Sequence, residues 1–200
     1  MNKTIYYGLS RKYIFYTVLL GSVVLLLYSI FFKPSALSDF AVSIVFFAIL
    51  YYFGKKYKIS IGAFLLVSVA ILSNLFGSFG LYAYFVLFGI IGYDKLVHFT
   101  SGFAVSYAIL QVITEKKTLL RFVFVILVAM GLGALVEINE FIGTRYFGIN
   151  NGGIFAIGDG LPVIKSDLQK YDTYYDMIFN FAGALMCAFF VSIQNHYSQG

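Results

Sequence analysis

One segment near the C-terminus governs how the chain is interpreted: Tyr171-Asp172-Thr173-Tyr174-Tyr175-Asp176-Met177-Ile178-Phe179-Asn180-Phe181-Ala182-Gly183-Ala184. It is largely apolar, yet it contains Asp172, Asp176 and Asn180 at intervals of four residues. On a helix this spacing places the three side chains on one face. A charged group inside a membrane is costly unless it faces a partner or water. The segment therefore predicts a membrane helix whose polar face has partners on other helices.

The composition supports a membrane protein. The chain has 200 residues, of which 60% are hydrophobic and only 12% are charged, and its mean hydropathy is +0.87. This leaves too little polar surface for a water-soluble globule. The net charge of +5 would suggest nucleic acid in a soluble protein, but the basic residues lie in short clusters between apolar runs, which is typical of topology signals. We therefore expect the lipid bilayer as a partner and no nucleic acid.

Six apolar runs are long enough to cross a hydrocarbon core of about 30 Å. They cover residues 13–32, 36–53, 59–76, 96–113, 119–141 and 174–193. A further apolar piece, rich in glycine and aromatic residues, lies near 77–93 and is short for a crossing. It is either a seventh span or an interfacial, partly re-entrant segment.

Basic residues decide between these two topologies. They precede the first span and lie between the second and third and between the fourth and fifth: Lys3, Arg11, Lys12, Lys55, Lys56, Lys58, Lys116, Lys117 and Arg121. Six spans place all three groups on one side of the membrane, which the positive-inside rule makes cytoplasmic. We therefore predict an all-α fold: a polytopic bundle of six transmembrane helices in the cell (inner) membrane, with both termini cytoplasmic and residues 1–200 forming a single domain. The segment near 77–93 and the long connection 142–171 then lie on the outer side.

Polar residues converge at the outer ends of three predicted helices. Asp94, Lys95 and His98 open the fourth helix, Glu137, Asn139 and Glu140 close the fifth, and the Asp172–Asn180 face opens the last. His98 should lie about 6 Å deeper than Asp94, four residues earlier on the same helix. This depth matches Glu137 and Asp176, so the three can form one polar layer.

Each polar residue also has a structural interpretation. Asp94 and Asp172 stand where a carboxylate caps a helix N-terminus, and Lys95 can snorkel to the interface. Glu137 lies near the predicted end of its helix, where the dipole disfavours an anion. We therefore expect something cationic or protonated to compensate it, and His98 and Lys95 are the nearest candidates by depth.

Small residues accompany the polar ones. Asn180 can hydrogen-bond to a neighbouring helix, and Gly183 and Ala184 after it favour close helix packing. Gly131 and Gly133 in the fifth helix predict the same. Cys187, the single cysteine, excludes an intrachain disulfide and is expected to be a small buried side chain.

Three strings in the second half of the chain form a recognisable set: Tyr93-Asp94-Lys95-Leu96-Val97-His98-Phe99, Ala134-Leu135-Val136-Glu137-Ile138-Asn139-Glu140-Phe141 and Tyr171-Asp172-Thr173-Tyr174-Tyr175-Asp176-Met177. Their order and spacing resemble the YjdF-like inner-membrane proteins, a family of unknown function, and more distantly the VanZ-like family. The chain has tyrosine where the YjdF-like pattern usually has tryptophan. The resemblance implies that the motif positions are Asp94, His98, Glu137, Asp172 and Asp176.

Three functions remain open from the sequence. The cluster could bind or act on a lipid-linked or envelope substrate, serve a small transporter or ligand-binding protein, or only hold helices together. We predict Asp94, His98, Glu137 and Asp176 as catalytic candidates, and Lys95, Glu140, Asp172 and Asn180 as substrate-binding candidates. His98, Glu137 and Asp176 are also candidate ligands of a divalent metal ion, with donor types that suit zinc, manganese or iron. The sequence has no HExxH motif, and whether the chain is an enzyme stays open.

Overall fold

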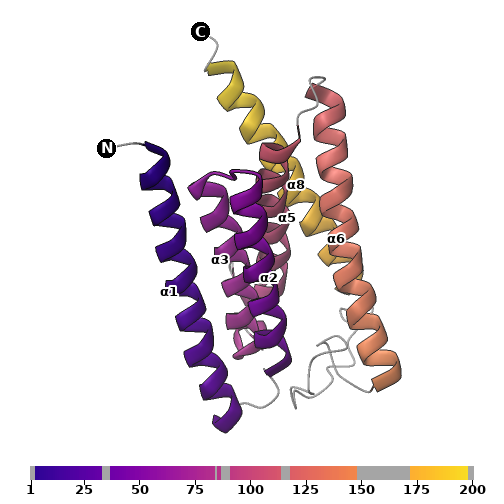
Figure 1. The fold of residues 1–200 in the computed structure, drawn as a ribbon. Helices are drawn as coiled ribbons and strands as arrows, with labels where there is room; N and C mark the ends of the chain where they lie inside the picture. Colours follow the sequence, from indigo (N-terminus) through magenta and orange to yellow (C-terminus); the bar gives the residue numbers. More distant parts are fainter. Residues whose placement is uncertain are drawn as a thin grey trace.

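The computed structural model describes residues 3–32, 37–83, 85–86, 91–113, 118–147 and 172–197. Within these residues the chain is a bundle of long α-helices (Figure 1). They are α1 (Lys3–Phe32), α2 (Leu37–Lys56), α3 (Ile61–Ser78), α5 (Tyr93–Val112), α6 (Thr118–Phe147) and α8 (Asp172–Tyr197). Each predicted apolar run therefore lies largely in a helix of its own.

Among the described residues, four helical segments are long and apolar enough to cross a membrane: Lys12–Phe32, Ile61–Ser78, Leu119–Ile138 and Asp172–Gln194. The chain is thus a membrane protein with several candidate transmembrane helices. The other two helices, α2 and α5, have 20 residues each, and α5 carries Asp94, Lys95, His98 and Gln111 among its apolar residues. That all six helices span the membrane stays a prediction.

The segment near 77–93 contains no long helix in its described part. After α3 come a 3-10 turn, η2 (Leu81–Ala83), and two short strands, β1 (Phe85–Val86) and β2 (Ile91–Gly92), which pair antiparallel. The prediction of an all-α fold therefore omitted one short antiparallel pair of strands. Because the antiparallel pair turns the chain back, α5 begins at the end of the bundle where α3 ends.

Two glycines explain how this turn fits against α3. Gly80 has a φ of 122°, a left-handed value that side chains rarely adopt. A Cβ on Gly77 would overlap the ring of Tyr82, whose hydroxyl donates a hydrogen bond to Asn74 Oδ1. The turn is therefore folded tightly onto the last turns of α3.

Helix α5 lies at the centre of the packing. It makes its most extensive contact with α8 and also packs against α3 and α6, whereas α1 contacts α2 and α3 and lies at the edge of the bundle (Figure 1). Leu110, Val125 and Cys187 form a buried apolar cluster that joins α5, α6 and α8. Cys187 is fully buried and free, as predicted.

Glycine allows the closest approach of α5 and α8. A Cβ on Gly183 would overlap the carbonyl oxygen of Phe99, and a Cβ on Gly102 would overlap that of Asn180. Close packing at Gly183 is thus confirmed. Gly133 is also confirmed, because a Cβ there would lie 2.6 Å from Asn180 Nδ2, but the expectation for Gly131 is wrong, because nothing lies within 4 Å of its Cβ position.

Helix α6 is longer than its apolar run. It continues to Phe147, ten residues after Glu137, so the placement of Glu137 near a helix C-terminus is wrong. Residues 142–147, expected to begin the long connection, are helical: the segment has no proline, and the single Gly143 does not end the helix. The rest of that connection, 148–171, lies outside the described residues.

Candidate functional site

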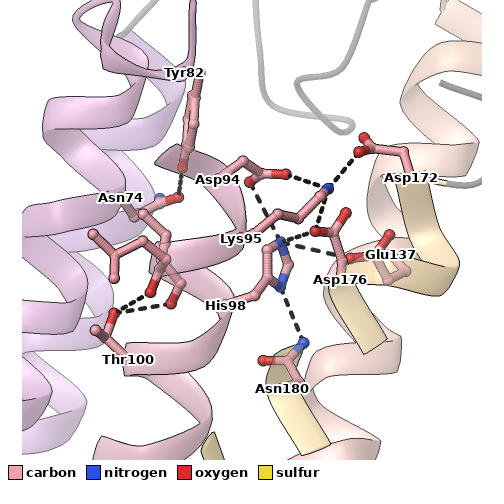
Figure 2. Close-up of polar contacts among 12 residues, drawn as sticks. Asn74, Tyr82, Asp94, Lys95, His98, Thr100, Glu137, Asp172, Asp176 and Asn180 are labelled. Carbon is pink, nitrogen blue, oxygen red and sulfur yellow. Dashed lines mark hydrogen bonds and ion pairs between the residues drawn. The ribbon is translucent and has the colours of Figure 1, made fainter. Parts of the chain in front are cut away.

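Seven of the polar residues predicted to converge meet at one end of the bundle, while the side chains of Asn139 and Glu140 lie outside the described residues (Figure 2). The first two turns of α5 contribute Asp94, Lys95 and His98, because a spacing of four puts the first and last of these on one face. Helix α6 contributes Glu137, and α8 contributes Asp172, Asp176 and Asn180 by the same periodicity. We call these seven residues the polar cluster.

Lys95 holds the outer half of the polar cluster together. Its Nζ lies 3.0 Å from Asp94 Oδ2 and 2.6 Å from Asp176 Oδ1, and it also pairs with Asp172 Oδ1. An ammonium has three hydrogens to donate, so these three carboxylates satisfy it fully. Lys95 therefore joins α5 to α8. Its ammonium pairs with carboxylates instead of extending unpaired towards the membrane interface.

His98 holds the inner half. Its Nε2 lies 3.5 Å from Asp94 Oδ1, 3.6 Å from Asp176 Oδ1 and 3.8 Å from Glu137 Oε1. All three distances exceed an ordinary hydrogen bond. Nδ1 on the other side of the ring lies 3.0 Å from Asn180 Nδ2, which confirms the predicted contact of Asn180 with another helix. His98 thus contacts the Asn180 amide through Nδ1 and faces three carboxylates through Nε2.

The centre of the polar cluster is closed off from its surroundings. His98, Glu137, Asp176 and Asn180 are each less than 9% exposed, and Asp176 only 1%. Glu137 Oε1 is buried without a hydrogen-bond partner. A buried oxygen without a partner is unfavourable, so this carboxylate needs a proton or a cation.

The formal charges of the polar cluster do not balance. The cluster contains four carboxylates and one ammonium, which leaves a charge of −3 with neutral His98 and −2 with protonated His98. Buried charges are normally paired or coordinated to a metal. The arrangement can therefore accept further positive charge.

The polar cluster contains a group of side chains that could hold a metal ion. Ligand atoms of Asp94, His98 and Asp176 all lie within 4.8 Å of one another. The predicted trio had Glu137 in place of Asp94. Glu137 Oε1 is 3.8 Å from His98 Nε2, so it borders the same space as a fourth carboxylate.

Asp94 does not cap α5, Asp172 stands at the start of α8, and the side chain of Glu140 is not described. The N-cap of α5 is Gly92, without a side-chain cap, and Asp94 instead contacts Lys95 and His98. Asp172 is the first residue of α8 and pairs with Lys95. The side chain of Glu140 lies outside the described residues.

Sequence reasoning missed the contacts that attach the start of α5 to α3. Tyr93 Oη donates a hydrogen bond to the Ser73 carbonyl oxygen at 3.0 Å, and Tyr82 pairs with Asn74 beside the polar cluster (Figure 2). The Tyr93 contact fixes the first turn of α5, which holds Asp94 and Lys95, and the Tyr82 contact attaches the preceding η2 turn to α3. Tyr82 and Tyr93 lie in an aromatic-rich run, and the pattern of that run does not indicate which residues they contact.

Fold and site together define a helical membrane protein with a buried His/carboxylate cluster at one end of its bundle. The chain belongs to the family described as predicted membrane protein DUF2238, whose model matches residues 13–196. The resemblance to YjdF-like proteins is consistent with this family, whereas similarity to the VanZ-like family is not shown. No curated protein and no solved structure matches the chain.

Proposed function

We propose that the protein binds a divalent cation between His98 and the surrounding carboxylates, and through it an anionic group of a lipid-linked ligand. One observation carries the proposal: oxygens of Asp94, Asp176 and Glu137 lie 3.5–3.8 Å from His98 Nε2. These distances are too long for hydrogen bonds. They are close to the spacing of about 3.0–3.4 Å between neighbouring ligands that each lie about 2.1 Å from one ion.

The contact behind His98 fits this role. A metal-binding histidine usually donates its other ring N–H to an oxygen acceptor. Asn180 occupies that position at His98 Nδ1, and its amide can present either nitrogen or oxygen in the same space. With the oxygen facing Nδ1, the ring donates to Asn180 and directs the Nε2 lone pair at the carboxylates.

The surroundings of the polar cluster favour a ligand with an apolar part. Exposed side chains flank it on α8 and α6: Tyr174, Ile178, Leu135 and Ile138 are each more than half exposed. In a membrane such side chains face lipid. A cation at this place would attract an anionic head group while the chains of the ligand lie along these helices.

We also propose that all six helices span the membrane, with both termini cytoplasmic and the polar cluster on the extracytoplasmic side. The basic end of α2, Lys55 and Lys56, supports this topology. Phe53 and Tyr57 beside it share an apolar groove with Val112 and Ile113 at the end of α5, whereas the polar cluster lies at the start of α5. The positive-inside rule then places the two ends on opposite sides.

Labelling with a membrane-impermeant maleimide tests this topology, since Cys187 is buried. Leu81→Cys, in the exposed turn after α3, should react in intact cells. Lys58→Cys should react only after permeabilisation. The reverse pattern would invert the topology and place the polar cluster inside.

Titration of Zn²⁺ and Mn²⁺ into the purified protein in mild detergent tests the binding site. Single changes of His98, Glu137 or Asp176 to alanine should each weaken binding by about 10-fold or more, given the size of metal-site effects. Gln111→Ala is a matched control, because Gln111 joins α5 to Ser60 of the α2–α3 connection at the other end of the helix. Unchanged affinity in all three variants would contradict the proposal.

The contacts between α5 and α8 favour a structural role as the second candidate. Lys95 pairs with Asp172 and Asp176, and Asn180 contacts His98, so the polar cluster joins these helices without any ligand. A purely structural cluster predicts that the folded wild type binds neither ion and that all three alanine variants lose their fold.

A further inference from the structure

Lys95 is placed where a bound cation would be expected. Its Nζ is within 3.0 Å of carboxylates from two helices, and its side chain is only 14% exposed. This largely buried lysine is a counter-ion shared by three aspartates, and it offsets one of their three negative charges. The four-carbon stem of lysine, however, is flexible and easily redirected.

The ammonium and a metal ion would share the same ligand atoms. Asp176 Oδ1 lies 2.6 Å from Lys95 Nζ and 3.6 Å from His98 Nε2, so one oxygen serves both halves of the polar cluster. Asp94 is also shared, with Oδ2 towards Lys95 and Oδ1 towards His98. A divalent ion at these carboxylates would repel an ammonium held by the same oxygen.

Asp172 gives Lys95 another position. The Asp172 side chain is 37% exposed, against 1% for Asp176, so the two aspartates form an outer and an inner contact for the same ammonium. Lys95 lies in the first turn of α5, where a long stem can turn towards the end of the helix. It can therefore leave Asp176 and remain paired with Asp172.

We propose that Lys95 is an exchangeable internal counter-ion: its ammonium occupies Asp94 and Asp176 when the site holds no metal, and a divalent cation entering at His98 displaces it outward to Asp172. This inference rests on the proposed cation site and adds its regulation. The exchange keeps a cation beside the buried carboxylates in both states. It also lowers the affinity for the cation, because binding must break two ion pairs of Lys95.

The first experiment compares affinity. Lys95→Met retains the apolar stem and removes the charge, so Zn²⁺ or Mn²⁺ should bind at least 10-fold more tightly than to the wild type. Lys55→Met, an exposed lysine at the opposite end of the bundle, should leave affinity unchanged. Tighter binding in both variants would indicate only a general charge effect and overturn the proposal.

The second experiment follows Lys95 in the wild type, so it does not depend on how the variant folds. Acylation by an amine-reactive reagent, read by peptide mass spectrometry, should be slow at Lys95 without metal and several-fold faster at saturating Mn²⁺. Labelling of Lys55 should not change. Equal protection of Lys95 with and without a bound ion would refute the exchange while leaving the cation site intact, and absence of ion binding would refute the proposed function itself.

Discussion

Helices α8 and α1 differ in a way that hydropathy alone does not reveal. The apolar part of α1 has a mean hydropathy of 2.3 and only 6% of it is buried in the protein, whereas α8 has a lower mean of 1.8 and 33% is buried. The more polar helix is the better packed one. In a membrane, small and polar residues rather than apolar ones bring helices together, and α8 has Gly183 and Asn180 at its contact with α5.

The largest expected effect comes from adding one methyl group at the α5–α8 contact. Gly183→Ala places a Cβ against the carbonyl oxygen of Phe99, and backbone cannot move aside as a flexible side chain can. We expect a loss of about 3 kcal/mol or more of unfolding free energy, at the upper end for overpacking. Thermal unfolding in detergent measures it.

Gly21→Ala is the control for this substitution, since nothing lies within 4 Å of the Cβ position at Gly21 in α1. It should be neutral or slightly stabilising, because alanine favours a helix over glycine. Equal stability of Gly183→Ala and Gly21→Ala would mean that α8 is not packed more closely than α1.

An effect of intermediate size on stability is expected to distinguish two aspartates that pair with the same lysine. Asp172 and Asp176 both pair with Lys95, but Asp176 is 1% exposed and Asp172 is 37% exposed. Asp176→Ala should cost about 2–3 kcal/mol because it removes the most buried of the three acceptors of the Lys95 ammonium and leaves one of its hydrogens without a partner. Asp172→Ala should cost about 1 kcal/mol or less, as for an exposed pair.

Denaturation of both variants, compared with wild type under one set of conditions, checks this order. Equal losses would mean that burial does not set the strength of these ion pairs. A greater loss for Asp172→Ala would reverse the depth assigned to the two residues.

The smallest effect is expected in α1. Leu20 is 67% exposed and would face lipid, so Leu20→Ala should change stability by about 0.5 kcal/mol or less. Leu110→Ala in α5, where Leu110 is 2% exposed, should cost about 2–5 kcal/mol. A loss at Leu20 that matches the loss at Leu110 would show that α1 is packed more tightly than the structure indicates.

Much of the candidate site could be predicted because helical periodicity determines it. The spacing of four in Asp94–His98 and in Asp172–Asp176–Asn180 fixes which side chains share a face. The direction of each helix then places the three sets at one end. The contact of Asn180 with a neighbouring helix is confirmed, and the structure identifies His98 as its partner.

Other features depend on contacts that spacing does not encode. The pairing of Lys95 with both Asp172 and Asp176 depends on the register of α8 against α5, and so does the approach of ligand atoms of Asp94, His98 and Asp176 to within 4.8 Å of one another. The continuation of α6 to Phe147 was missed because residues 142–147 are less apolar, and helix ends do not follow hydropathy. The β1–β2 pair was missed because its strands have two residues each, too short for an alternating pattern.

Equilibrium dialysis against Mn²⁺ or Zn²⁺, followed by elemental analysis, tests the central claim most directly. The wild-type protein in mild detergent and a folded His98→Ala variant would be dialysed side by side. The proposed site predicts about one bound ion per wild-type chain, as for a single mononuclear site, and a clear deficit in His98→Ala. A folded wild type that retains no ion above the dialysis buffer, or an equal ion content in both proteins, would contradict it.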